Sequence, residues 1–209
     1  MGERIPRSYS WELPYTYNPN PKGDSMRPIL LLCAMLLQTA PQAALKPLID
    51  NDRVTAWDVS GPVAVQPLDA IVVSLPTGNA EFLAKGMTPK AEGRSIIIDL
   101  KDHSVPSVAN TTGYPLAFPR PGSKKILEND RVIVWDYSWA PGVATPMHFH
   151  DKDTVVVFLE DGDLSSTTPD GKVVVNSATP GTVRFNPRGR THTETLVRGK
   201  QQAIITELK

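Results

Sequence analysis

The chain contains an internal repeat, which limits the folds open to it. Residues 49–60 return as residues 127–138, with seven of twelve positions identical at an offset of 78. A second pair of segments, residues 96–101 and 204–209, matches at an offset of 108. The first copy therefore lacks about thirty residues that the second contains. Two copies of one unit predict a duplicated fold, because a solenoid needs at least three repeats.

The second copy consists of short strand-like segments separated by turn residues. Turn signals such as Pro169–Gly171 and Pro187–Gly189 recur at short intervals, and valine, threonine and isoleucine dominate between them. No apolar pattern with helical spacing is sustained beyond residue 45. We therefore expect an all-β sandwich or barrel over residues 126–209, a smaller related unit over 46–101, and a proline-rich linker over 102–125.

Three of the four histidines lie in two of the strand-like segments, and together they predict a metal site. His148 and His150 are two residues apart, so in a strand they share a face. His192 lies in a second segment and can supply a third imidazole to the same ion. Iron, manganese, nickel and zinc all accept imidazole as divalent ions, so the pattern selects one divalent metal without identifying it. The alternative is three histidines that are only hydrogen-bonded to their neighbours.

The spacing of these segments resembles the two sequence motifs of the cupin superfamily. The matching positions are Gly142, His148, His150 and Gly162 for the first motif, and Gly181, Pro187, Gly189 and His192 for the second. The resemblance covers about residues 120–209 directly, and residues 46–101 through the repeat. It implies a cupin-type double-stranded β-helix, or jelly-roll, barrel. The repeat adds a duplicated, bicupin-like layout with a degenerate N-terminal half.

The sequence departs from the cupin motifs at two positions. Thr154 and Val155 stand where the first motif has a glutamate, and Leu196 stands where the second motif has an asparagine. The resemblance therefore implies three histidine ligands without the usual carboxylate. Thiol dioxygenases are a familiar kind of cupin with such a set. Three neutral ligands leave the ion its full charge and leave coordination positions open.

Glu194 and Thr154 are the candidate catalytic residues. Glu194 lies two residues after His192, so in a regular strand it shares the same face. It can act there as a fourth ligand, a base or a hydrogen-bond partner of an imidazole. Thr154 can hydrogen-bond a water on the metal. The alternatives are a solvated rim residue for Glu194 and a plain wall residue for Thr154.

Two further groups of side chains have both a structural and a functional interpretation. Three arginines near the second motif can bind an anionic substrate or remain solvated turn charges: Arg184, Arg188 and Arg190. Three aromatic residues alternate along one strand and are expected in the core, with a pocket wall as the alternative: Trp135, Tyr137 and Trp139. Trp57 holds the place of Trp135 in the first copy.

The first copy is expected to lack the histidine site. Pro89 aligns with His192, and apolar residues or Asp69 are expected opposite the other two histidines. The first copy is therefore predicted to pack against the second and cover its exposed sheet edges.

Residues 1–45 read as a polar extension followed by a secretory signal peptide with an apolar core over 28–37. A positive charge precedes the apolar run, and small and polar residues follow it. The run is short for a membrane span. The only cysteine, Cys33, falls within it. We therefore expect an extracytoplasmic protein, periplasmic or secreted, without stable membrane association after processing. A buried helix and a retained anchor are the alternatives, and Met1 and Met26 are both candidate start sites.

The net charge of the chain and the predicted histidine site together define the functional hypotheses. Lysine plus arginine and aspartate plus glutamate each number 22, so the formal net charge is zero and gives no electrostatic support for a nucleic-acid partner. The first hypothesis is an exported metal-dependent oxidoreductase, dioxygenase-like, that acts on a small molecule. The alternatives are a non-catalytic cupin that binds a metal or a small ligand, and a metal-assisted isomerase or lyase. The sequence also permits a homodimer.

Overall fold

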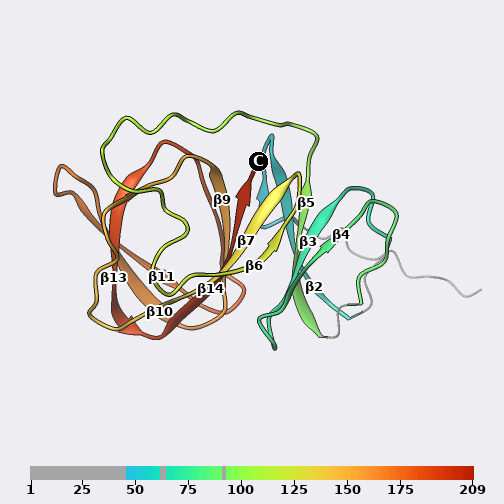
Figure 1. Ribbon diagram of the computed structural model, residues 1–209. Coiled ribbons are helices and arrows are strands. Elements are labelled where there is room, and N and C mark those ends of the chain that lie inside the picture. The colour runs from blue at the N-terminus through green and yellow to red at the C-terminus, as the bar shows by residue number, and fades with distance from the viewer. Residues whose placement is uncertain (1–45, 62–64, 91–92) are drawn as a thin grey trace, which may run out of the picture. The chain divides into compact units, whose positions relative to one another are not determined.

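The computed structural model describes residues 46–61, 65–90 and 93–209 (Figure 1). These residues form three antiparallel sheets, which confirms the predicted all-β class. No helix in this part of the chain is long and apolar enough to cross a membrane. The predicted extension and signal peptide, residues 1–45, lie outside the described residues.

Two of the sheets face each other and form a barrel. The five-stranded barrel sheet has the order β12 (Val183–Asn186), β9 (Asp153–Phe158), β14 (Gln201–Leu208), β7 (Val132–Trp139), β6 (Lys124–Glu128). The four-stranded barrel sheet has the order β11 (Val173–Ala178), β10 (Gly162–Thr167), β13 (Thr191–Gly199), β8 (His148–Phe149). Buried side chains from both sheets share one core, in which Trp135, Tyr137 and Trp139 lie. Their predicted core position is confirmed.

The third sheet, here called the N-terminal sheet, has the strand order of the five-stranded barrel sheet. Its order is β1 (Ile49–Asp50), β2 (Val54–Ser60), β5 (Arg94–Leu100), β3 (Ala70–Ser74), β4 (Ala80–Leu83). Each strand corresponds in turn to β6, β7, β14, β9 and β12. The first copy therefore retains one sheet of the barrel. In the described residues it has no counterpart of the four-stranded sheet, which accounts for its missing length.

The two tryptophans of the repeat make the same contact in the two copies. Trp57 on β2 donates its indole N–H to Asp99 on β5 at 2.8 Å. Trp135 on β7 donates to Glu207 on β14, also at 2.8 Å. Asp99 and Glu207 are equivalent in the repeat. Burial raises the pKa of both carboxyl groups, against the opposing effect of the indole hydrogen bonds. The repeat thus preserves the hydrogen-bonded pair, but the surroundings differ: Trp57 is half-buried, whereas Trp135 is buried in the barrel core.

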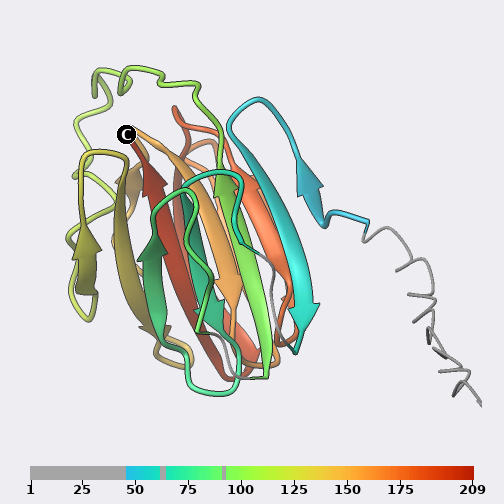
Figure 2. The same ribbon diagram turned by 90° about the vertical axis from the view of Figure 1, so that its right-hand side faces the viewer.

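The N-terminal sheet packs face to face on the five-stranded barrel sheet (Figures 1 and 2). Alternate residues of β9 point into the barrel, and the residues between them, Val155 and Val157, point outward. They share a buried cluster with Ile71 on β3 and Ile98 on β5. Both faces of this barrel sheet therefore bury apolar side chains and are covered. The expected packing of the first copy takes place on a sheet face rather than along sheet edges.

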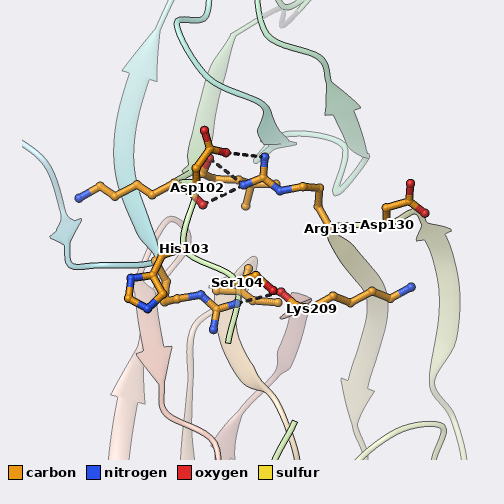
Figure 3. A pocket seen from close by; sticks show the side chains of 10 residues that line it. Asp102, His103, Ser104, Asp130, Arg131 and Lys209 are labelled. Carbon is orange, nitrogen blue, oxygen red and sulfur yellow. Dashed lines mark hydrogen bonds and ion pairs between the residues drawn. The ribbon is translucent and has the colours of Figure 1, made fainter. Parts of the chain in front are cut away.

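Two arginines cross between the halves in a reciprocal exchange. Arg53, which precedes β2, donates to Asp153 of the barrel at 2.7 Å. Arg131, its equivalent before β7, donates to Asp69 of the first copy at 2.9 Å. Asp69 and Asp153 are themselves equivalent. Asp69 precedes β3 and accepts a backbone N–H from the turn after β4, and Asp153 begins β9 and accepts one from the turn after β12. The contact is therefore close to two-fold symmetric, and a cavity of about 320 Å³ lies beside it (Figure 3).

The hydrogen-bond pattern corrects one alignment expectation. Gly189 donates its backbone N–H to the carbonyl of His150, and the equivalent Gly86 donates to the carbonyl of Gln66. Gln66 therefore holds the place of His150, where an apolar residue or Asp69 was expected. The error arose because the segment between β2 and β3 is shorter than the segment between β7 and β9, so no sequence match fixed the register.

The segment predicted as a linker, residues 102–125, crosses from the N-terminal sheet to the barrel (Figure 1). Its second part joins the barrel wall. Phe149 donates its backbone N–H to Pro115 and accepts one from Ala117, at 2.8 Å each. Ala117 and Phe118 are buried in the barrel core. This part of the segment closes the barrel beside β8.

The two crossing arginines give a test of the interface between the halves. Arg53 and Asp153 are each 8% exposed, whereas Arg131 and Asp69 are 31% and 25% exposed. Removing Arg53 leaves the buried Asp153 with only the longer contact to Arg188, 3.4 Å away. We expect Arg53→Ala to lower the free energy of unfolding by about 3 kcal/mol and Arg131→Ala by about 1 kcal/mol. Urea denaturation measures both losses. Equal losses would contradict the burial argument.

Candidate functional site

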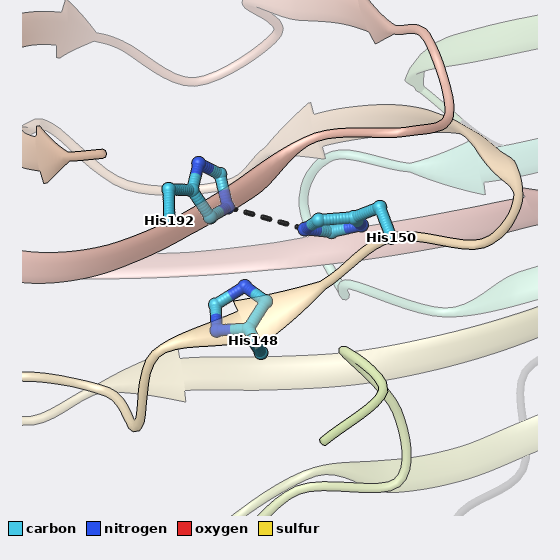
Figure 4. Close-up of side chains that lie close together, drawn as sticks. All are labelled: His148, His150 and His192. Carbon is cyan, nitrogen blue, oxygen red and sulfur yellow. Dashed lines mark hydrogen bonds between the residues drawn. The ribbon is translucent and has the colours of Figure 1, made fainter. Parts of the chain in front are cut away.

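The three motif histidines meet inside the barrel (Figure 4). His148 on β8 lies directly across from His192 on β13, and His150 follows the end of β8. All three are buried, and their ring centroids lie 4.8–5.0 Å apart. The backbone of His150 is fixed by bonds to Arg190 and Gly189, in the turn before His192. The two motifs thus hold each other in place.

The nitrogen positions fit a metal site in part. The Nε2 atoms of His150 and His192 are 3.1 Å apart, close to the separation set by two metal–nitrogen bonds of about 2.0–2.1 Å. The three candidate ligand atoms lie within 4.8 Å of one another, a wider limit than the ~4 Å expected from those bond lengths. His148 donates its Nδ1–H to the carbonyl of Pro146 at 2.7 Å, which leaves its Nε2 unprotonated, the form that a metal ligand requires.

The surroundings keep the imidazoles neutral, as metal binding requires. Burial, and then the charge of Arg120, lower the pKa of His148 to about 4. Burial and the neighbouring histidines lower the pKa of His150 well below its usual value. Burial also lowers the pKa of His192, and this effect exceeds the opposing effect of Glu194. The buried three-histidine cluster could therefore bind a metal at neutral pH.

A cavity of about 70 Å³ adjoins His150 and His192. Thr154 lines it from β9 and is 1% exposed. Its hydroxyl has no hydrogen-bond partner in the described part of the chain. An unpaired buried hydroxyl is costly, so this oxygen is available to a ligand or a water in the cavity.

Glu194 also lines the cavity, on the face of β13 that carries His192. Its carboxylate accepts the indole N–H of Trp139 at 3.2 Å and lies 3.6 Å from a guanidinium nitrogen of Arg120. Burial raises its pKa, but the coupling to His192, the charge of Arg120 and the indole bond outweigh that effect and lower it. Glu194 is therefore an ionised carboxylate inside the barrel.

Arg120 is the site residue that the sequence did not reveal. It comes from the segment expected to be a linker and donates to Nε2 of His148 at 3.1 Å. Its guanidinium lies over the ring of Tyr137, 3.9 Å from the centroid, and near Phe118 and Trp139. No spacing rule connects Arg120 with the histidine motifs. The one available signal was the alternation of aromatic residues on β7, because aromatic rings can pack against a cation.

The three arginines near the second motif separate in the structure. Arg184 and Arg190 line the cavity, whereas Arg188 lies 3.4 Å from Asp153, outside it. Arg190 donates to Nδ1 of His192 at 2.9 Å. A metal held by Nε2 of His192 would need the proton on Nδ1, so it would displace this hydrogen bond.

The chain was compared with protein-family models, with curated proteins and with solved structures. No protein-family model matches the chain. The beta-alanine degradation protein BauB of Pseudomonas aeruginosa is 47% identical over 45 residues, a match that spans 22% of this chain and 47% of that protein. The chain thus covers about half the length of this curated relative.

Two solved cupin structures are also similar to the chain. A cupin domain from Bordetella pertussis is 30% identical, over 44% of this chain and 97% of that domain, with a TM-score of 0.39. A cupin 2 conserved barrel domain protein from Leptotrichia buccalis is 12% identical, over 82% of this chain and 92% of that protein, with a TM-score of 0.44. The identity to the Bordetella domain extends over nearly its whole length, and the histidines of both motifs meet in one barrel. The chain therefore belongs to the cupin superfamily.

Proposed function

We propose that the barrel binds one divalent metal ion through His148, His150 and His192 and catalyses the oxygen-dependent oxidation of a small molecule. The observation that carries this proposal is the convergence of three buried, neutral imidazoles beside a polar cavity. When bound, such an ion supplies Lewis-acid chemistry and the coordination positions that three protein ligands leave open. Divalent iron, manganese, nickel and zinc are the candidates.

In this proposal the chain's own residues bind the substrate and move its proton. Glu194 is an ionised carboxylate next to His192 and serves as the base. Thr154 offers its unpaired hydroxyl to the substrate or to a water. Arg120 holds Glu194 in position and stabilises its charge. The aromatic side chains around Arg120 keep bulk water away from this pair.

A second candidate, a non-catalytic cupin that binds a small ligand without metal, is favoured by one observation. Arg120 donates to the Nε2 lone pair of His148, the atom that a metal would use. A metal would therefore have to displace this guanidinium from the ring. Elemental analysis of the purified protein separates the two candidates, because only the first requires a bound divalent ion.

The curated relative supplies a first choice of substrate to test. That protein is named for β-alanine degradation, and β-alanine is a small carboxylate. We therefore propose β-alanine and other three-carbon carboxylates as the initial panel.

His192→Ala is expected to abolish stoichiometric metal binding, because two imidazoles hold a divalent ion far less tightly than three. His103→Ala is the matched control, since His103 is exposed and lies outside the cluster. Elemental analysis after incubation with each metal gives the result. Equal metal content in wild type and His192→Ala would contradict the metal proposal.

Glu194→Gln is expected to reduce turnover by about 10²- to 10⁴-fold, the range for loss of a general acid or base. The metal content should be unchanged, because the three imidazoles remain. Initial rates of oxygen uptake by Fe(II)-loaded protein with the carboxylate panel provide the measurement. Absence of oxygen uptake by the wild type with every metal would favour the non-catalytic candidate.

We also propose that the protein is exported through the apolar segment that begins at Met26. Its basic start and its small, polar end support this proposal. Mass spectrometry of protein recovered from cells is expected to find an N-terminus near Ala44 or Leu45. A cytoplasmic protein that begins at Met1 would overturn it.

A further inference from the structure

We propose that the cavity beside the three histidines binds the carboxylate group of a small anionic molecule, through Arg184 and Arg190. This inference rests on the proposed function, because it names the class of small molecule that the same site binds. The histidines alone do not specify this class, because three imidazoles can serve neutral, cationic and anionic substrates.

The charges that line the cavity do not balance. Its lining residues include three guanidinium groups and one carboxylate. Arg120 is paired with the carboxylate of Glu194. Neither Arg184 nor Arg190 has a carboxylate within 4 Å in the described part of the chain. Two positive charges are thus left over, and a bound divalent ion would add two more.

These two arginines are also removed in part from water. Burial lowers the pKa of the Arg184 guanidinium, and Glu194 offsets this only in part. A charge withdrawn from water without a counter-charge is unfavourable. An anion in the cavity would supply that counter-charge.

Arg184 is held in place from two sides. Its guanidinium donates to the carbonyl of Ser177 on β11 at 2.6 Å and lies 5.1 Å from the ring centroid of Phe158. Only one of its donors is used in these contacts, and the group lies in the cavity lining. A fixed guanidinium with free donors matches the two oxygens of a carboxylate. Asn176 and Asn186 line the same cavity and add amide groups.

The deeper end of the cavity offers polar partners for the rest of the ligand. The Thr154 hydroxyl is buried and has no partner in the described residues. Arg190 reaches from the cavity lining to His192 at 2.9 Å, and so connects the arginines with the histidines. A ligand with its carboxylate at Arg184 would therefore have its other end close to the histidine cluster.

The cavity volume limits the size of the ligand. A cavity of about 70 Å³ favours a small ligand. The class chosen for the test is therefore a short-chain carboxylate.

The test compares a carboxylate with its neutral isostere on the full-length protein. We expect propionate to bind at least tenfold more tightly than propionamide, in both chelator-treated and metal-loaded protein, as measured by isothermal titration calorimetry. Arg184→Gln should weaken propionate binding by about 10- to 100-fold, the effect of a lost charge-assisted hydrogen bond. Metal content should be unchanged, because in the described part of the chain Arg184 makes no hydrogen bond to the histidines.

Arg188→Gln is the matched control, because Arg188 follows the same strand but lies against Asp153 outside the cavity. Its propionate affinity should equal that of the wild type. If Arg184→Gln does not fold, Arg184→Lys keeps the charge without the planar fork, and its affinity should fall by about tenfold. Thermal unfolding of each variant shows whether it is folded.

The outcomes separate this inference from the proposed function. Equal affinity for propionate and propionamide, or unchanged propionate binding by a folded Arg184 variant, would overturn the carboxylate subsite even in a metal-loaded protein. Binding of propionate that depends on Arg184 in a protein that takes up no metal would support the subsite and overturn the metal proposal.

Discussion

The five-stranded barrel sheet buries apolar side chains on both faces, and the rest of the structure depends on covering both. Its inward residues pack in the barrel core and its outward residues pack on the N-terminal sheet. Fully burying one valine or isoleucine contributes about 1.5–3 kcal/mol, and several outward side chains are buried in this way. Each crossing arginine contributes less than this total. Apolar burial therefore holds the halves together, while the reciprocal arginines set their orientation.

A chain of contacts connects this interface with the histidines. Arg53 of the first copy holds Asp153 at the start of β9. Asp153 also accepts the backbone N–H of Arg188, in the turn before His192. The next residue, Gly189, donates to the carbonyl of His150. The first copy has no histidine cluster of its own among its described residues, yet its arginine supports the turn that joins two of the three imidazoles.

The fold class and the histidine cluster could be predicted from the sequence, because both depend on local spacing. Alternation in a strand places His148 and His150 on one side, and the motif spacing brings in His192. The place of Gln66 was missed because only hydrogen bonds across the sheet fix its register. Arg120 was missed because it arrives from a proline-rich segment without regular periodicity. The different directions of Arg184 and Arg188 depend on long-range partners, Ser177 and Asp153, which no local pattern reveals.

The near two-fold contact between the halves resembles the contact between two subunits, but both partners belong to one chain. A separate subunit leaves its partner when the protein is diluted. A tethered one stays at an effective concentration set by the connecting segment, in the millimolar range for short flexible tethers. The outward face of the barrel sheet is thus covered at any protein concentration. Its exposure is a unimolecular opening, which neither dilution nor a shortage of a second copy can promote.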